Sequence, residues 1–381
     1  LFFLFTYAII NVAAFVESFG ANPSFRPRFR AFHWTIALYG AAACVAAAFL
    51  IDLTLSTVAL LVIIALYCFI RYRNLEMSYG DARRGFVYSR IHSLLLQLPK
   101  LPLHPKNWRP TIVVLSGDPE RRGQLIEYAI LFSQRRGILS VIQILISDDP
   151  RHIGDRRTPR LRAFRELARQ RIWPIFPTVV IAPEFDVALR IILQSHSLDP
   201  IRPNIVLMGW PTREERVPPF FTHLHTIVED FRRNVLVLIN ERDTFTPQRY
   251  DGGTIDIWWQ SSAGGSLMTI LAYLVQLDRN WRKSVLRIFL PMDREKERKI
   301  RKVLDAARIE AELVRIEEDA KLRIVVPRYS TGAELVFIEF PDYSTTDERR
   351  QRITHQLIRR DFKNLPPCFL VVSNGEADLL A

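Results

Sequence analysis

Three long apolar stretches open the chain and decide what it can fold into. They cover residues 1–16, 31–51 and 53–70, and few charged residues interrupt them. A hydrocarbon core about 30 Å thick requires roughly 17–25 apolar residues per helix. The stretch AAACVAAAFLI also lacks the polar face that a helix of a soluble protein shows. We therefore predict three membrane-spanning helices, at about 1–19, 33–51 and 54–70, within a membrane part that covers residues 1–73.

Basic residues flank these stretches at their predicted inner ends. The flanking arginines are Arg26, Arg28, Arg30, Arg71 and Arg73. Asp52 lies instead at the turn between the second and third stretches. Basic flanks stay on the cytoplasmic side of a membrane, so we place the arginines inside and Asp52 outside. The expected location is the plasma membrane, crossed several times, with everything after Arg71 in the cytoplasm.

The second apolar stretch carries small residues at helical spacing, namely Ala37, Gly40, Ala41, Cys44, Ala47 and Ala48. Small side chains let membrane helices approach closely. Two interpretations stay open for this face. It packs against a neighbouring helix of the same chain, which we favour, or it meets a second copy around Gly40 and Cys44.

Residues 74–108 connect the membrane part to the rest of the chain. The stretch after RYRNLEMSYGD predicts an amphipathic helix with an apolar stripe at Val87, Ile91, Leu94, Leu95 and Leu98. The proline-rich stretch LPKLPLHPKNWRP then ends that helix. The stripe could lie on anionic lipid headgroups or pack on the following domain, and we favour the domain.

From Thr111 onward, short β-branched runs alternate with helical patterns, which is typical of a parallel sheet covered on both faces. The segments NIVLMGWP and ELVFIEFP repeat one unit about 130 residues apart. We predict two tandem α/β lobes, at 109–245 (lobe one) and 250–381 (lobe two), with a fold similar to that of the universal stress proteins. The stretch KLRIVVPRYSTG is expected to replace a helix of lobe two.

Ligands of such sheets bind at the turns from strand to helix. These turns are SGDPERRG in lobe one and QSSAGGS in lobe two, and they give the candidate nucleotide-binding residues Ser116, Gly117, Gly264 and Gly265. Neither turn matches a phosphate-binding glycine motif. A glycine pair at the start of a helix also has a simple structural explanation as a tight turn, which we prefer.

Other chemistry finds little support in the sequence. There is no CxxC motif or Cys/His cluster, so we expect no metal site and no metal cofactor. His223 and His225 are two residues apart on a predicted helix and so do not face each other. We expect both side chains to lie on the solvent-exposed surface. No recognisable Ser/His/Asp or Cys/His set occurs, so an enzyme is not expected. The net charge of +12 is dispersed in arginine pairs without interleaved aromatic residues, which argues against nucleic acid as a partner.

Several segments, in order, carry a family resemblance: NPSFRPRFRAFHW, SYGDARRG, KNWRPTIVVLSG, GTIDIWWQSSAGGSLMTIL and WRKSVLRIFL. Together they resemble the cation–chloride cotransporters, most closely the potassium–chloride branch, within the amino acid–polyamine–organocation superfamily. The resemblance implies electroneutral symport of chloride with potassium or sodium by a bundle of inverted repeats. The three apolar helices would end that bundle.

The resemblance also implies what the remaining parts do. The family's ion ligands lie on helices that precede this chain, so no ion-binding residue is expected within it. The two lobes would form a regulatory domain that makes a homodimer, chiefly through lobe two. Animal members carry a phosphorylated insertion where this chain has a short connection at about 317–333. The chain opens at Leu1 inside an apolar run, and we expect a longer protein upstream.

Two other functions remain open. An amino-acid permease of the same superfamily would share the membrane part, but most such permeases end soon after their last helix. A membrane-tethered nucleotide sensor would use the two α/β lobes, although the chain lacks a glycine-rich phosphate loop.

Overall fold

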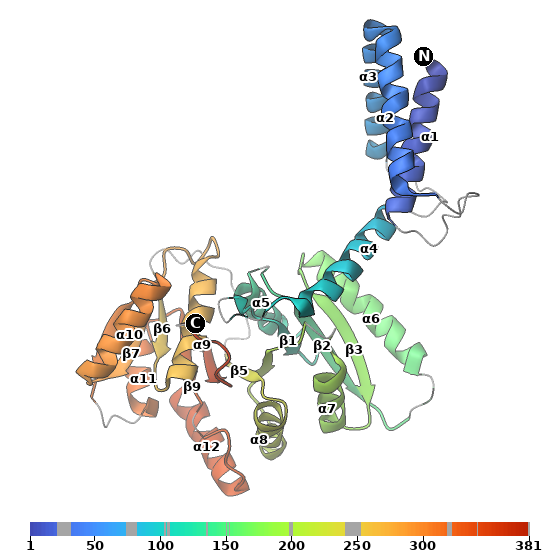
Figure 1. Ribbon diagram of the computed structural model, residues 1–381. Coiled ribbons are helices and arrows are strands. Elements are labelled where there is room, and N and C mark those ends of the chain that lie inside the picture. The colour runs from blue at the N-terminus through green and yellow to red at the C-terminus, as the bar shows by residue number, and fades with distance from the viewer. Residues whose placement is uncertain are drawn as a thin grey trace. The chain divides into compact units, whose positions relative to one another are not determined.

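The computed structural model of the chain consists of two compact units, residues 1–102 and 103–381 (Figure 1). The structure describes residues 1–20, 32–73, 82–102, 104, 107–134, 136–149, 151, 153–197, 201–240, 253–317, 322–340 and 342–379.

The first unit holds the apolar helices α1 (Phe2–Phe19), α2 (Trp34–Ile51) and α3 (Leu53–Tyr72). By length and composition, all three could cross a membrane. The small-residue face of α2 packs against α1. Ala37 and Ala41 are buried, and the Asn11 side chain of α1 lies where a side chain on Gly40 would otherwise point. This face therefore serves packing within the chain, the first of the two interpretations.

Helix α4 (Ala82–Gln97) follows in the same unit and continues into the short 3-10 helix η1 (Leu98–Lys100). The ring of Phe86 in α4 stacks on that of Phe19, with centroids 5.6 Å apart. Gly20 permits this approach, because a side chain there would meet the backbone of Phe86. Val87 and Ile91, on the predicted apolar stripe, are exposed.

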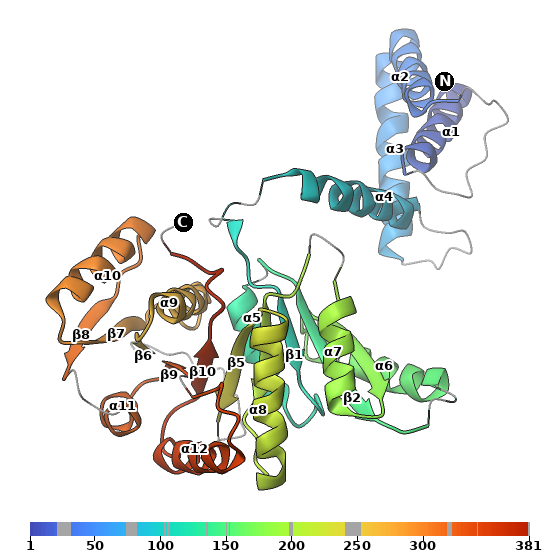
Figure 2. The same ribbon diagram turned by 60° about the horizontal axis from the view of Figure 1, so that its bottom comes forward.

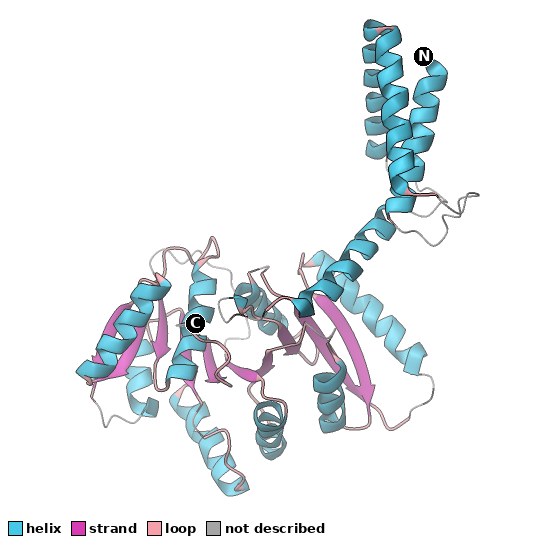
Figure 3. Cartoon of the chain, in the orientation of Figure 1, coloured by secondary structure: helices cyan, strands magenta, loops and turns pink. Residues whose placement is uncertain are grey.

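The second unit is built around one ten-stranded sheet (Figure 3). The strands are β1 (Ile112–Leu115), β2 (Leu139–Ile146), β3 (Phe176–Ala182), β4 (Ile205–Gly209), β5 (Asn234–Ile239), β6 (Thr254–Trp258), β7 (Val285–Pro291), β8 (Glu312–Ile316), β9 (Leu335–Glu339) and β10 (Cys368–Val372). They lie in the order β3-β2-β1-β4-β5-β10-β9-β6-β7-β8. Each lobe thus repeats one strand order, and the two lobes meet at their last strands.

That meeting is the one antiparallel pairing of this sheet, with Val237 of β5 opposite Leu370 of β10. The sequence predicts two lobes, and the structure merges them into one continuous sheet. The physical reason is that each lobe alone would end in an apolar edge strand with unpaired backbone groups. Antiparallel pairing of β5 with β10 satisfies both edges, and residues of both strands are fully buried.

Helices cover both faces of the sheet (Figure 2). Residues from α5 (Gly123–Ser133), α6 (Ile153–Gln170), α9 (Ser262–Gln276) and α10 (Arg294–Ala307) pack into the hydrophobic core on one face. Residues from α7 (Phe185–Ser195), α8 (Val217–His225), α11 (Leu322–Ser330) and α12 (Glu348–Asp361) pack on the other face. The 3-10 helix η3 (Glu214–Arg216) precedes α8, and the short π-helix η4 (Thr226–Asp230) extends it. The two lobes thus contribute matching helices to each face.

Helix α11 was not expected from the sequence. The stretch KLRIVVPRYSTG was expected to lack a helix, but Leu322–Ser330 is helical despite Pro327 within it. A proline inside a helix removes one backbone hydrogen bond. Burial offsets that loss here, because Val326 is fully buried and Leu322 and Val325 pack on the same core.

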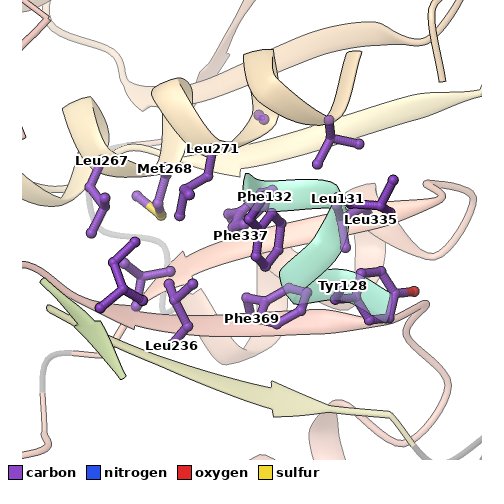
Figure 4. Close-up of a cluster of buried hydrophobic side chains, with 14 of the residues drawn as sticks. Tyr128, Leu131, Phe132, Leu236, Leu267, Met268, Leu271, Leu335, Phe337 and Phe369 are labelled. Carbon is purple, nitrogen blue, oxygen red and sulfur yellow. The ribbon is translucent and has the colours of Figure 1, made fainter. Parts of the chain in front are cut away.

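An aromatic cluster joins the lobes on the α5 face of the sheet (Figure 4). Phe132 of lobe one lies with its ring centroid 5.0 Å from that of Phe369 and 5.9 Å from that of Phe337, both of lobe two. Tyr128 contacts Phe369 edge-on at 5.2 Å. All four side chains are buried, so the lobes share one core at this position.

Polar contacts join the lobes on the opposite face. The imidazole of His355 in α12 stacks on Trp210, with centroids 5.1 Å apart, and its Nε2 donates to the carbonyl oxygen of Pro211 at 2.8 Å. The hydroxyl of Tyr343 donates to a carboxylate oxygen of Glu229 at 2.9 Å. Lobe two therefore binds lobe one through α12 and the segment that precedes it.

The Tyr343 contact predicts a loss of stability at alkaline pH. Burial, together with the neighbouring Glu229 carboxylate, raises the pKa of Tyr343 to about 12 from the ordinary value of 10.0. The folded state holds this proton more tightly than the unfolded chain, so the contribution is complete below pH 10 and is lost between pH 10 and 12. We expect the difference in melting temperature between the parent and Tyr343→Phe to shrink over that range. A difference that stays constant up to pH 12 would contradict this assignment.

Candidate functional site

The carboxyl ends of β1 and β4 meet beside the start of α5. Leu115 pairs with Met208 across these strands, so the next position of each strand brings Ser116 beside Gly209. Side chains of a strand alternate between its faces, which places both positions on the face that α5 covers. We call Ser116, Gly117, Arg122 and Gly209 the α5 site.

Ser116 has an unusual environment within this site. It is fully buried, and its hydroxyl makes no hydrogen bond to any described residue. A buried polar group without a partner costs about 1–3 kcal/mol. Gly117 follows with a φ of +63°, and a side chain there would meet nothing within 4 Å. The turn therefore offers a buried hydroxyl and open space beside it.

The first turn of α5 adds positive charge. Its N-cap residue, Arg122, provides no side-chain hydrogen bond to the free backbone N–H groups of the helix. The Arg122 guanidinium lies 3.5 Å from the position that a β-carbon on Gly209 would take. Helix N-termini attract anions through these N–H groups and the helix dipole. The arrangement is suited to binding an anion rather than to catalysis.

Lobe two fills the equivalent position with its own side chains. Glu339, which corresponds to Gly209, accepts hydrogen bonds from the backbone N–H of Ser261 at 2.9 Å and from its hydroxyl at 2.8 Å. The Ser261 hydroxyl also accepts from the N–H of Gly264 and so caps α9. Trp259 corresponds to Ser116 and is buried.

The two glycines of lobe two are explained by this packing. A β-carbon on Gly264 would lie 2.8 Å from the Glu339 carboxylate, and one on Gly265 would lie 2.2 Å from the Trp259 indole. Both glycines belong to the first turns of α9, not to a tight turn before it. They permit close approach of a carboxylate and an indole, so lobe two holds an internal carboxylate where lobe one has Gly209.

The five arginines predicted to flank the membrane helices are only partly covered by the structure. Arg26, Arg28 and Arg30 lie outside the described residues. Arg71 is in the last turn of α3, and Arg73 is exposed just after it. Nucleotide binding at Ser116, Gly117, Gly264 and Gly265 stays a prediction.

The two histidines differ in environment. His225 is exposed, as expected. His223 is half-buried, and its ring lies 4.7 Å from that of Phe185. Burial lowers the pKa of His223 below its ordinary value. Across the described residues, no group of three His, Cys, Asp or Glu side chains is suited to hold a metal ion.

Sequence reasoning missed Glu339 and Arg122. The signal for Glu339 was present in the repeat, where ELVFIEFP has glutamate at the position of glycine in NIVLMGWP. Comparing the two lobes position by position would have identified the exchange. The role of Arg122 has no such signal, because its contact with Gly209 depends on how α5 crosses the sheet.

Comparison with known proteins supplies the family. The sequence profile of Solute carrier family 12 matches residues 222–324, from α8 through the start of α11. Over these residues, the chain is similar to Solute carrier family 12. This is the cation–chloride cotransporter family, so the match supports the resemblance expected from the sequence, while the potassium–chloride branch stays a prediction. Solute carrier family 12 consists of membrane transport proteins, and the three apolar helices of this chain are long enough to cross a membrane.

Solved structures provide a further comparison. A universal stress protein from Archaeoglobus fulgidus is 14% identical, with a TM-score of 0.44, and the match covers 68% of this chain and 95% of that protein.

Proposed function

We propose that this chain is the carboxyl-terminal part of an electroneutral symporter that carries chloride with potassium or sodium across the plasma membrane. The observation that supports the proposal most is the family match over residues 222–324, in a chain that also carries three helices of membrane-spanning length. In this proposal the chain provides scaffold helices and a cytoplasmic regulatory domain, and the ion ligands lie upstream.

The membrane unit suits a scaffold role. Ion pathways through membranes are marked by ionisable side chains inside the bundle. Within the described parts of α1, α2 and α3, charged side chains occur only near the helix ends, at Glu17 and Arg71. The amide of Asn11 donates to the carbonyl oxygen of Tyr7 on the same helix. Its polar group is thus satisfied locally and needs no ion.

Uptake measurements separate this proposal from an amino-acid permease. Cells that express the complete protein should take up rubidium, a potassium substitute, in a chloride-dependent manner. The same cells should show no added uptake of labelled amino acids. Amino-acid uptake that needs no chloride would instead support the permease.

We also propose that the cytoplasmic lobes form a homodimer. The family resemblance motivates lobe two as the contact, and burial of the small residues of α2 against α1 favours that lobe over Gly40 and Cys44. Cross-linking of the complete protein in membranes, with cysteines introduced one at a time on lobe two, tests it. A protein that stays monomeric with every introduced cysteine would refute it.

A second candidate function is nucleotide sensing at the α5 site. The specific observation is the contrast between the lobes. Glu339 occupies this position in lobe two, whereas lobe one has Gly209 there, beside Arg122 and the unpaired hydroxyl of Ser116. The phosphates of a nucleotide would be held by the first turn of α5 and Arg122. Nucleotide binding would regulate transport, so this second function would exist beside the transport function.

A matched variant tests the nucleotide proposal. ATP at about 100 times its dissociation constant should stabilise the protein by about 2.7 kcal/mol, seen as a higher melting temperature. Gly209→Glu should abolish this shift, because it places a carboxylate where lobe two has Glu339. Gly332→Ala, at a position with open space, is the control and should keep the shift. No shift in the parent, or an unchanged shift in Gly209→Glu, would refute binding at this site.

A further inference from the structure

The turn that ends α6 contains a residue in an unexpected conformation. Ile172 has a φ of +56°, a left-handed backbone conformation that is strained for a β-branched residue and that glycine adopts freely. Its side chain is 83% exposed. Glycine would adopt this backbone conformation with less strain. The isoleucine side chain does not offset the strain, because it buries little apolar surface. Such an outlier suggests a role outside folding.

Ile172 borders an open hollow of about 760 Å³ between the ends of α5 and α6. The floor is largely apolar and includes Trp173, Pro174, Ile175 and Pro177. Phe176, the first residue of β3, is also exposed. Pro177, which lines the hollow, belongs to β3, an edge strand of the sheet (Figure 1). This surface combines exposed apolar side chains with a shallow, widely open shape.

Arginines line the same surface. Arg165 and Arg169 of α6 border the hollow, and Arg162 precedes them at the spacing that places all three on one side of the helix. All three are exposed. Arg169 lies 3.5 Å from Glu166 in an exposed pair, which contributes little. Arg162 and Arg165 form no ion pair with any described residue, so their charges are available to a partner.

We propose that this surface, Arg162, Arg165, Arg169 and Ile172 with the hollow beside them, binds anionic phospholipid of the bilayer in which the chain is anchored. Arginines bind the phosphate-containing headgroups, and Ile172 enters the interface between headgroups and acyl chains. Basic residues combined with exposed apolar side chains are the composition of membrane-surface segments. The partner's identity rests on the proposed cytoplasmic placement, because the cytoplasmic leaflet carries the anionic lipids.

A bilayer fits this surface better than other anions do. The surface is open and has an apolar floor, unlike the enclosed pocket that holds a small ligand. The chain carries three bilayer-length helices, so a lipid surface is always tethered nearby and acts at high effective concentration. An acidic protein would match the arginines but would have to compete with that surface.

Hydrogen exchange on the whole chain in nanodiscs tests the proposal. Nanodiscs of phosphatidylcholine alone are compared with nanodiscs that also contain phosphatidylserine. We expect amides 162–177 to exchange several-fold more slowly with phosphatidylserine, and high salt to remove this difference. Each basic residue at an anionic surface adds about fivefold in affinity. The double variant Arg165→Glu with Arg169→Glu should therefore lose the difference.

Two further variants separate binding from folding. The control Arg349→Glu with Arg350→Glu changes the same charge on the exposed start of α12 and should keep the protection. Ile172→Gly relieves the backbone and should keep the fold while it weakens the protection. Equal exchange in both nanodiscs would overturn the proposal. The proposal would also be overturned if soluble glycerophosphoserine or an acidic peptide slowed the exchange of amides 162–177 in phosphatidylcholine nanodiscs. The surface would then bind a free anion or a protein.

Discussion

Phe132→Ala is expected to destabilise the α/β unit by about 3–5 kcal/mol, the largest effect among single substitutions considered for this protein. Phe132 is fully buried and packs on Phe337 and Phe369 across the boundary between the lobes. Truncation removes its apolar contacts and leaves a cavity that neighbours on a rigid sheet cannot fill. Because the cavity lies where the lobes share a core, both lobes should lose stability together.

The measurement is thermal unfolding of the purified chain, in which the melting temperature should fall by roughly 10 °C. Phe176→Ala makes the same chemical change at a side chain that is 62% exposed and should shift the melting temperature by only a degree or so. A fall of similar size in both variants would show that the effect does not come from the shared core. A small fall in Phe132→Ala alone would contradict the packing described.

Gly265→Ala is expected to have the second large effect, a net loss of about 2 kcal/mol. Its β-carbon would lie 2.2 Å from the indole of Trp259, which is buried and cannot move aside. Overpacking of this kind costs about 1–3 kcal/mol, occasionally more. The better helix propensity of alanine, worth about 1 kcal/mol, offsets only part of it.

Gly154→Ala is a matched control that should raise the stability of the chain, whereas Gly265→Ala lowers it. Gly154 is also inside a helix, α6, but a side chain there would meet nothing within 4 Å. The substitution should stabilise the chain, by up to about 1 kcal/mol. Combining Gly265→Ala with Trp259→Leu should recover part of the lost stability, because the smaller side chain makes room. Without such recovery, the contact between Trp259 and Gly265 would not be the cause.

Local sequence patterns predicted the strands and the membrane helices well, for a physical reason. A buried parallel strand is a short apolar run, and a spanning helix is a long one, so both appear directly in the sequence. The error at α11 has the opposite origin. Pro327 signals a break locally, and only burial of Val326 in the assembled core overrides that signal.

Other features depend on contacts between distant residues. The pairing of β5 with β10 joins Val237 to Leu370, and no local pattern states which strands become neighbours. The candidate turn at Ser116 was found from its place after a strand, but its unpaired hydroxyl and the Arg122 contact needed the structure. The left-handed conformation of Ile172 was also unexpected, since its sequence predicts no such turn.

The central claim is that the complete protein couples chloride to a cation without net charge movement. The most direct test reconstitutes that protein in liposomes and measures labelled rubidium or sodium and labelled chloride uptake in the same preparation. We predict that cation and chloride enter in amounts of equal charge, and that replacing chloride by gluconate stops cation uptake. Cation uptake that continues in gluconate, or chloride entry without a cation, would contradict it.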